Sequence, residues 1–269
     1  MSDNSKVILI TGVSSGIGKT AAQFLAKKGH NVYGTSRYPG SYEKPSNYTM
    51  LPMDVTDDES IESATALIIK KESKIDVLIN NAGFGIAGAM EHTSIGKAKE
   101  QFETNFFGPV RLIKSVLPIM HKQDSGLIIN ISSIGGLIGL PFQNMYSASK
   151  FAIEGLTESL YKELYSSNIK IVLIEPGDFK TGFTEKRIIP RLSNQPKVFK
   201  DALHVIENDE NSGQNPIKIG KLLNKVINNP NPRLRYTVGA FDQKLATMLK
   251  RLLPNRLFDW IIMKHYKVV

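Results

Sequence analysis

Short continuous aliphatic runs recur along the chain and alternate with longer segments whose apolar residues are spaced as on a helix. Runs of this kind predict strands that are buried on both faces, as in a parallel sheet. The predicted strands cover residues 6–11, 31–36, 48–53, 75–79, 126–131, 169–174 and 234–238. Their alternation with helices predicts an α/β fold, a doubly wound parallel sheet of about seven strands with helices on both faces.

The helical periodicity also predicts where the chain bends. We expect helices over residues 19–28, 57–71, 97–121, 146–164, 217–227 and 241–266. Gly108 and Pro109 interrupt the third of these helices. Because proline removes one backbone hydrogen bond and clashes with the preceding turn, a kink is expected near Asn105. Pro254 is expected to break the last segment in two.

Residues 183–216 lack a clear period and contain two prolines and several asparagines. Such a segment, placed between regular elements, predicts a mobile lid or substrate loop. A long surface excursion without a role at the site is the alternative.

The composition is that of an ordinary globular protein, because 41% of the 269 residues are hydrophobic and 22% are charged. The chain has no cysteine, which excludes disulfides and thiolate metal sites. We expect no metal site. No apolar run approaches the roughly 18 residues that span a bilayer, and the N-terminus lacks the pattern of a signal peptide. We therefore expect a cytoplasmic protein.

The formal net charge of +9 raises the question of an anionic partner. The lysines and arginines are scattered rather than gathered in a basic block, which argues against nucleic-acid binding. An anionic cofactor would also suit a basic protein.

A glycine-rich segment follows the first strand and opens the first helix. Small residues in this context let the backbone approach a phosphate, and the amide groups of the helix N-terminus point at the anion. The candidate contacts are Gly12, Ser14, Ser15, Gly16, Ile17 and Gly18. A tight turn without a ligand is the alternative.

The end of the second strand indicates which dinucleotide is preferred. An acidic residue there would hydrogen-bond the adenosine ribose and favour NAD, whereas this chain has Ser36 and Arg37. A hydroxyl and a guanidinium suit a 2′-phosphate, so we expect NADP(H) in preference to NAD(H). Asp54 and Val55 end the third strand, and Asp54 would either accept from an adenine amino group or serve as a turn residue.

Polar or glycine-containing segments also follow the later strands, where open α/β sheets bind ligands. These segments include Asn81, Ala82 and Gly83 after the fourth strand, Ser133 after the fifth, and Pro176, Gly177 and Thr181 after the sixth.

Tyr146 and Lys150 are four residues apart at the start of an amphipathic helix, so they lie on one helical face. A phenol has an ordinary pKa of about 10, and a nearby cation favours its ionised form. This pair is a candidate acid–base catalyst. A surface tyrosine beside a solvated lysine is the alternative.

Taken together, these motifs resemble the classical short-chain dehydrogenase/reductase family through the first two-thirds of the chain. The matching segments are Thr11-Gly12-xxx-Gly16-x-Gly18, Asn80-Asn81-Ala82-Gly83, Asn105, Ser133, Tyr146-xxx-Lys150 and Pro176-Gly177-xxx-Thr181. The stretch from Ser133 to Leu160 is similar to the branch that contains 17β-hydroxysteroid and retinol dehydrogenases and bacterial relatives. The last third matches only loosely.

The resemblance implies a Rossmann-type fold with strand order 3-2-1-4-5-6-7 and an enzyme that interconverts a carbonyl and an alcohol with NADP(H). By resemblance, Tyr146 is the general acid in reduction and the base in oxidation. Lys150 binds the nicotinamide ribose and lowers the pKa of the phenol, and Ser133 hydrogen-bonds the substrate oxygen. Asn105 holds a water in a proton relay.

The resemblance also implies that Thr181 and the turn at Pro176 and Gly177 orient the carboxamide. We expect one domain over residues 1–269. It comprises a cofactor-binding and catalytic core over 6–182, the lid over 183–216, and the C-terminal helices and last strand over 217–269.

The substrate is expected to be an apolar small molecule, such as a steroid, a retinoid, a lipid or another ketone. The expected apolar wall comprises Phe84, Ile86, Leu137, Pro141, Phe142 and Phe183. A dinucleotide-sensing protein of the same fold without turnover is the alternative. The apolar and basic tail, residues 241–266, is expected to pack over the cleft or against another subunit of a homodimer or homotetramer, in preference to a membrane surface.

Overall fold

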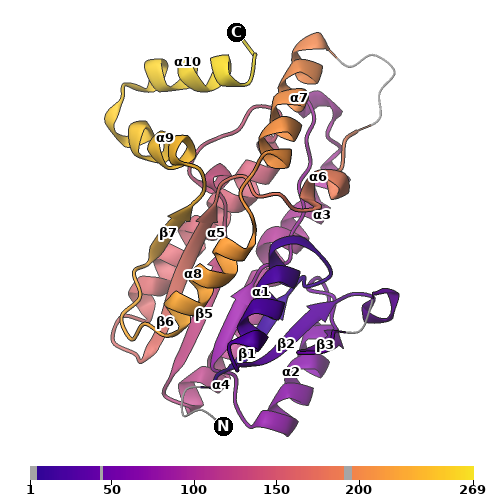
Figure 1. The fold of residues 1–269 in the computed structure, drawn as a ribbon, viewed down its shortest axis with the longest axis vertical. Coiled ribbons are helices and arrows are strands. Elements are labelled where there is room, and N and C mark those ends of the chain that lie inside the picture. The colour runs from indigo at the N-terminus through magenta and orange to yellow at the C-terminus, as the bar shows by residue number, and fades with distance from the viewer. Residues whose placement is uncertain (1–4, 43–44, 191–195) are drawn as a thin grey trace.

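The computed structural model describes residues 5–42, 45–190 and 196–269. In this part of the chain, seven parallel strands form one sheet in the order β3-β2-β1-β4-β5-β6-β7, which confirms the predicted topology (Figure 1). The strands are β1 (Val7–Thr11), β2 (Asn31–Ser36), β3 (Thr49–Pro52), β4 (Val77–Asn80), β5 (Gly126–Ile131), β6 (Ile169–Pro176) and β7 (Arg235–Val238). The strand order reverses between β1 and β4, and that reversal creates the crevice in which such sheets bind ligands.

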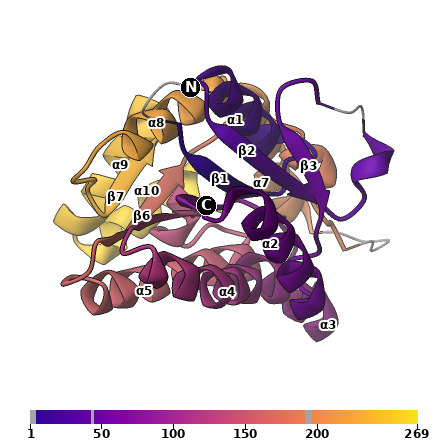
Figure 2. The same ribbon diagram turned by 90° about the horizontal axis from the view of Figure 1, so that it is seen from below.

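Helices cover both faces of the sheet (Figure 2). The helices are α1 (Gly16–Lys27), α2 (Asp58–Glu72), α3 (Ile95–Phe102), α4 (Gly108–Lys122), α5 (Asn144–Glu163), α6 (Phe183–Lys186), α7 (Lys197–Asn211), α8 (Ile217–Ile227), α9 (Phe241–Leu252) and α10 (Asn255–His265). Helices α1 and α8 lie on one face, and α2, α4 and α5 lie on the other. Helices α6, α7, α9 and α10 gather beyond one end of the strands, as Figure 1 shows.

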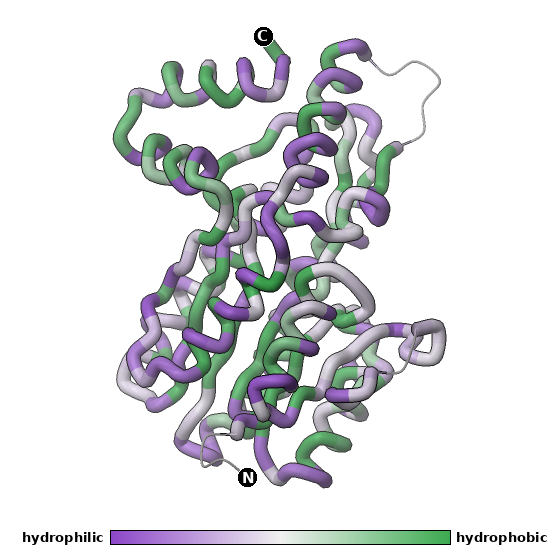
Figure 3. The backbone as a smooth tube through the Cα atoms, viewed as in Figure 1, coloured by the Kyte–Doolittle hydropathy of each residue, from purple (hydrophilic) through white to green (hydrophobic). Residues whose placement is uncertain are grey.

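The alternation of side chains along each strand separates two apolar cores. On β1, Ile8 and Ile10 belong to the core under α1 and α8, whereas Val7 and Leu9 belong to the core under α2 and α4. All four side chains are buried. Figure 3 shows the strands as apolar bands inside more polar helices. The aliphatic runs therefore form β-structure because both faces of the sheet must be dehydrated.

The expected kink is present as a π-helix over Glu103–Phe107, between α3 and α4. Proline lies at the second position of α4, where its missing N–H interrupts the helical ladder. A π-bulge widens the helix locally and often occurs at functional sites. Here it places Asn105, which is 1% exposed, against the segment after β4.

The prediction of an irregular segment over residues 183–216 was wrong in one respect. Helix α7, of 15 residues, occupies its second half, and the short helix α6 occupies its beginning. Part of the predicted lid, residues 191–195, lies outside the described residues. Helix α7 was not predicted, although its buried residues, Phe199, Ala202 and Ile206, have helical spacing.

The C-terminal tail breaks at Pro254 into α9 and α10, as predicted. Helix α9 has no buried residue, and Phe258 is the one buried residue of α10. Leu252 and Trp260 are among the exposed apolar side chains of the two helices. Among the described residues, no helix combines the length and apolar character needed to cross a bilayer.

Candidate active site

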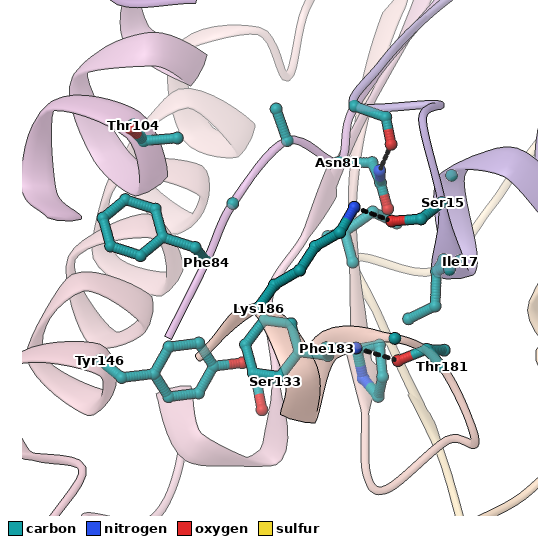
Figure 4. Close-up of a pocket in the computed structure, with 18 of the residues that line it drawn as sticks. Ser15, Ile17, Asn81, Phe84, Thr104, Ser133, Tyr146, Thr181, Phe183 and Lys186 are labelled. Atoms are coloured by element: carbon teal, nitrogen blue, oxygen red, sulfur yellow. Dashed lines mark hydrogen bonds between the residues drawn. The ribbon is translucent and has the colours of Figure 1, made fainter. Parts of the chain in front are cut away.

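A cavity of about 640 Å³ opens at the carboxyl ends of the strands. Figure 4 shows part of its lining, in which the oxygen of Tyr146 points toward Ser133. Every residue predicted to contact a cofactor lines this cavity: Gly12, Ser14, Ser15, Gly16, Ile17, Gly18, Ser36, Arg37, Asp54, Val55, Asn81, Ala82, Gly83, Tyr146, Lys150, Pro176, Gly177 and Thr181. Ser133 also lines it, whereas Asn105 lies behind the wall.

The glycine-rich segment leaves β1 and enters α1 through backbone angles that favour glycine. Gly12 has φ +71° and Gly16 has φ +58°, both in the left-handed region. A Cβ atom at Gly12 would lie 2.8 Å from the Cα of Ala82, and one at Gly18 would lie 2.4 Å from the carbonyl oxygen of Gly12. The tight packing brings bare backbone to the cavity surface.

The N-terminus of α1 is free to meet an anion. Its N-cap residue, Ser15, makes no side-chain capping bond, and the first turn carries no acidic residue. The first amide groups of a helix lack partners within the helix and carry a partial positive charge. This loop therefore fits a pyrophosphate.

Polar contacts join the glycine-rich loop to the segment after β4. The Thr11 hydroxyl accepts hydrogen bonds from the backbone amides of Asn81 and Ala82, at 3.0 and 2.9 Å. The Asn81 side chain donates to the carbonyl oxygens of Thr11 and Gly12, at 2.8 and 3.2 Å. These contacts hold the two loops at the crossover point in one rigid arrangement.

Tyr146 and Ser133 come together at the centre of the cavity. The Ser133 side chain is a hydrogen-bond partner of the Tyr146 phenol and lowers its pKa, but burial outweighs this effect and raises the pKa to about 12. The expected lowering by Lys150 is thus not what the structure shows. The Lys150 ammonium lies 5.9 Å from the centre of the Tyr146 ring and donates instead to the carbonyl of Ile131 at 2.8 Å.

Lys150 is 7% exposed, and burial lowers its pKa to about 8. Glu154, one turn further along α5, opposes that shift. The carboxylate of Glu154 is itself buried and pairs with Arg235 of β7, which also pairs with Glu175 at 2.7 Å. The buried Glu154 carboxylate therefore limits the fall in the pKa of Lys150 and favours its charged form near neutral pH.

The side chain of Asn105 is fully engaged with its surroundings. Its Nδ2 donates to the carbonyl of Phe84 and to the Ser149 hydroxyl, and its Oδ1 accepts from the amide of Phe84 at 3.0 Å. These contacts fix the chain beside Gly83. A Cβ atom at Gly83 would lie 3.0 Å from Asn105 and 3.9 Å from the Lys150 ammonium. Asn105 is therefore next to Lys150, and a relay role for it stays a prediction.

At the adenosine end, Arg37 is exposed and lines the cavity beside the buried Ser36. Asp54 lines the same end, but one of its oxygens accepts from the amide and hydroxyl of Thr56, at 3.0 and 2.8 Å. Asp54 is therefore part of a turn, and its contact with an adenine amino group stays a prediction.

Two of the six expected apolar wall residues line the cavity, Phe84 and Phe183. The other four do not: Ile86, Leu137, Pro141 and Phe142. Phe142 packs against Phe199 of α7, with ring centres 5.3 Å apart. This part of the prediction was wrong. Helix α7 covers Phe142, and the carbonyl of Leu137 accepts a hydrogen bond from Lys250 of α9. Leu140, Ile188 and Ile206 line the cavity instead.

Several charged residues of the cavity had no sequence signal. Lys186 of α6 donates to the Ser15 hydroxyl at 2.6 Å, so its ammonium lies on the glycine-rich loop (Figure 4). Asp178, Asp209 and Glu210 also line the cavity. No motif marks these residues, although the position of Asp178 directly after the turn at Pro176 and Gly177 was a possible signal.

The topology, the glycine-rich loop and the cavity define a nucleotide-binding α/β protein. Residues 6–190 match the sequence model of the short chain dehydrogenase family, and the chain is an oxidoreductase of that family. It is 45% identical to a 3-ketodihydrosphingosine reductase of Bacteroides thetaiotaomicron, over 98% of both chains. It is 38% identical to retinol dehydrogenase 8 of Bos taurus, over 87% of this chain and 82% of that protein.

Solved structures agree with this assignment. A short-chain dehydrogenase from Streptomyces avermitilis superposes with a TM-score of 0.83 at 29% identity, over 97% of this chain and 98% of that one. ElxO with NADP bound has a TM-score of 0.70 at 28% identity, and the match covers 87% of this chain and 97% of that one. A short-chain dehydrogenase/reductase from Burkholderia phymatum in complex with NAD shares the fold, with a TM-score of 0.77 at 23% identity, over 87% and 90%. A nicotinamide cofactor is therefore supported.

Proposed function

We propose that this chain is an NADP(H)-dependent reductase that converts a ketone on a lipid-like molecule into an alcohol, with 3-ketodihydrosphingosine as a substrate. One observation carries the proposal. The paired hydroxyls of Ser133 and Tyr146 share one cavity with the glycine-rich loop, so a carbonyl can lie beside two proton donors and a dinucleotide at once. The relative that is 45% identical over nearly the whole chain supports this substrate class.

The residues of the cavity fit the cofactor. The amide groups at the start of α1 would hold the pyrophosphate, and the ammonium of Lys186 would meet the same negative charge. Ser36 and Arg37 would hold a 2′-phosphate. No described acidic side chain takes the place of Ser36 or Arg37 at the end of β2, which supports NADP(H) over NAD(H).

The reduced nicotinamide supplies a hydride to the carbonyl carbon when it is bound. The protein has to hold the carbonyl and to protonate its oxygen. Ser133 and Tyr146 would both donate to that oxygen, and Tyr146 would release its proton to the developing alkoxide. Because the pKa of Tyr146 is raised to about 12, its phenol is protonated at neutral pH and available as a donor.

Lys150 would restore the proton to Tyr146. Its pKa of about 8 lets the ammonium lose and regain a proton near neutrality, whereas an ordinary lysine would remain charged. Glu154 would favour the charged form, and Asn105 would hold the loop around which the relay is built.

The test is to incubate the purified protein with NADPH and 3-ketodihydrosphingosine and to follow the absorbance at 340 nm. We expect NADPH to be consumed in proportion to an alcohol product identified by mass spectrometry. The alternative, a sensor, predicts that NADPH binds with no consumption for any ketone of a panel that also includes steroid and retinoid carbonyls. Binding without turnover across the whole panel would overturn the proposal.

A further inference from the structure

Acidic residues that do not belong to the glycine-rich loop line the cavity. Asp178, Asp209 and Glu210 all line it, together with Tyr146. Two of the carboxylates have a basic partner. Glu210 pairs with Arg187, whose side chain is fully buried, and Asp209 contacts His265 at 2.9 Å. Asp178 forms no ion pair with any residue that the structure describes, although His265 partly offsets its negative charge from beyond ion-pair distance.

Asp178 is held in place by a neutral partner alone. The Gln243 amide donates to its Oδ2, and the backbone amide of Asp178 donates to Gln243 Oε1 at 3.1 Å. Its Oδ1 accepts no hydrogen bond from a described residue. An ionised carboxylate that is partly withdrawn from water and lacks a cationic partner is energetically costly. The arrangement leaves one carboxylate oxygen of this cavity-lining residue without a hydrogen bond from a described residue.

The charge of Asp178 acts on the catalytic centre. Asp178 and Glu210 both oppose ionisation of the Tyr146 phenol, so their fields reach the position at which a carbonyl would be protonated. The cavity lining also includes Leu140, Ile188 and Ile206, which suit an aliphatic chain. A ligand that matches these side chains has an apolar chain and a cation close to its reacting group.

We propose that Asp178 determines substrate choice by binding a cationic amino group that the substrate carries next to its reacting carbonyl. This inference rests on the proposed function, and it narrows the substrate class from lipid-like ketones to amphipathic amino ketones. 3-Ketodihydrosphingosine belongs to that class, because its amino group is on the carbon beside the ketone. An ammonium there completes the ion pair that the protein itself does not supply.

The test uses two ketones that differ only in the amino group, 2-aminododecan-3-one and dodecan-3-one. Their kcat/KM values are measured with NADPH for the wild type and for Asp178→Asn, which removes the charge and keeps the shape. We expect the ratio of amino ketone to plain ketone to fall about 10-fold in Asp178→Asn, chiefly through KM. Comparing the ratio between proteins cancels the different reactivities of the two ketones.

Asp209→Asn is the matched control, because it removes the same charge from the same wall. Its effect on the ratio should be smaller, because His265 already offsets Asp209. An unchanged ratio in Asp178→Asn, with both ketones reduced, would overturn this inference and leave the proposed function standing. If the wild type reduces neither ketone nor 3-ketodihydrosphingosine, the proposed function itself fails.

A second measurement needs no variant. Burial, Glu210 and Asp209 raise the pKa of Asp178 to about 7, while Gln243 and His265 oppose the rise. The wild-type preference for the amino ketone should therefore fall as the pH drops below about 7. The amine is more fully protonated there, so the fall can arise only from the protein, through Asp178 or through His265 as it gains charge. In Asp178→Asn, the fall in preference at low pH should be smaller, because the contribution of Asp178 is gone. A wild-type preference that does not change with pH would contradict the proposal.

The melting temperature of Asp178→Asn tests the role of Asp178 independently of enzyme activity. Because the folded-state pKa of Asp178 is raised above its unfolded value, this group costs stability once it is ionised. The cost grows as the pH rises from about 4 to about 7 and then stays constant. Asp178→Asn should consequently have a higher melting temperature than the wild type at pH 8, and the difference should shrink at pH 5. A melting temperature below that of the wild type at pH 8 would show that Asp178 is structural.

Discussion

The two ends of the cavity are built in different ways. The cofactor end consists of short segments that follow β1, β2, β4 and β6, and each segment works through its backbone or through adjacent residues. The substrate end is assembled from single side chains such as Asp178, Ile206 and Tyr266, which come from a loop, from α7 and from the end of the chain. The first kind of site leaves a pattern in the sequence, and the second does not.

The charges of the two ends differ as well. The cofactor end has Arg37 and Lys186, which suit phosphate groups, beside Asp54, whereas the substrate side has Asp178, Asp209 and Glu210. One cavity therefore offers cations to the phosphates of a dinucleotide and carboxylates to a cationic substrate.

The largest expected effect separates catalysis from cofactor binding. Tyr146→Phe should lower kcat about 10²- to 10⁴-fold, because the phenol is the proton donor, while the Kd for NADPH stays within about 2-fold. Kinetics and fluorescence titration with NADPH measure the two quantities. Tyr161→Phe, an exposed position on the same helix, is the control and should retain activity. Full activity in Tyr146→Phe would rule out the proposed mechanism.

Gly18→Ala should act on the cofactor end alone. A Cβ atom would lie 2.4 Å from both the Gly12 carbonyl and the Asn81 side chain, so the loop must shift. We expect the affinity for NADPH to fall about 5- to 150-fold, in line with the 1–3 kcal/mol cost of overpacking. Gly139→Ala is the matched control, because a Cβ there meets nothing within 4 Å. Equal affinities of the two variants would mean that this loop does not hold the dinucleotide.

Arg37→Ala should change cofactor preference rather than catalysis. Loss of a charged hydrogen bond to a 2′-phosphate should raise the Kd for NADPH about 10-fold or more and leave the Kd for NADH nearly unchanged. Isothermal titration with both dinucleotides measures the difference. Arg256→Ala removes an equal charge from α10, outside the cavity, and controls for net charge. Equal losses for NADPH and NADH would contradict the assignment of Arg37.

The smallest expected effect concerns Lys186, which belongs to the predicted lid but contacts the cofactor end. Lys186→Met should weaken the binding of NADPH and of NADH to the same degree, about 3- to 10-fold, because both contain the pyrophosphate. The loss should diminish at high salt, since Lys186 is exposed. Lys180→Met, a nearby exposed lysine outside the cavity, is the control. A loss of affinity for NADPH alone would indicate that Lys186 contacts the 2′-phosphate instead of the pyrophosphate.

Most of the sheet and the cofactor end followed from the sequence. The strand over residues 31–36 and the strand over residues 126–131 have the bounds that were predicted, because a run that must be dehydrated on both sides has little freedom. The apolar wall was predicted poorly. Phe142 was expected to contact the ligand, but it packs against Phe199 of α7, and only the tertiary structure shows which apolar surface that helix covers.

The pKa values could not be predicted from spacing. Tyr146 and Lys150 are one turn apart, yet the ammonium donates to Ile131 and burial raises the phenol's pKa. Sequence separation places two groups on one helical face, but the solvent exclusion and neighbours that set their pKa values come from β5 and from α6 and α7.

The amino-acid sequence by itself determined the order of strands and helices, the phosphate-binding loop and the positions of the paired catalytic groups. These features depend on hydrophobic periodicity and on backbone geometry over a few residues. The tertiary structure alone decided which side chains face the substrate, above all that Asp178 lacks a cation while Glu210 and Asp209 have basic partners. Pairing of charges across segments that are distant in the chain depends on how the helices pack, and no local pattern encodes it.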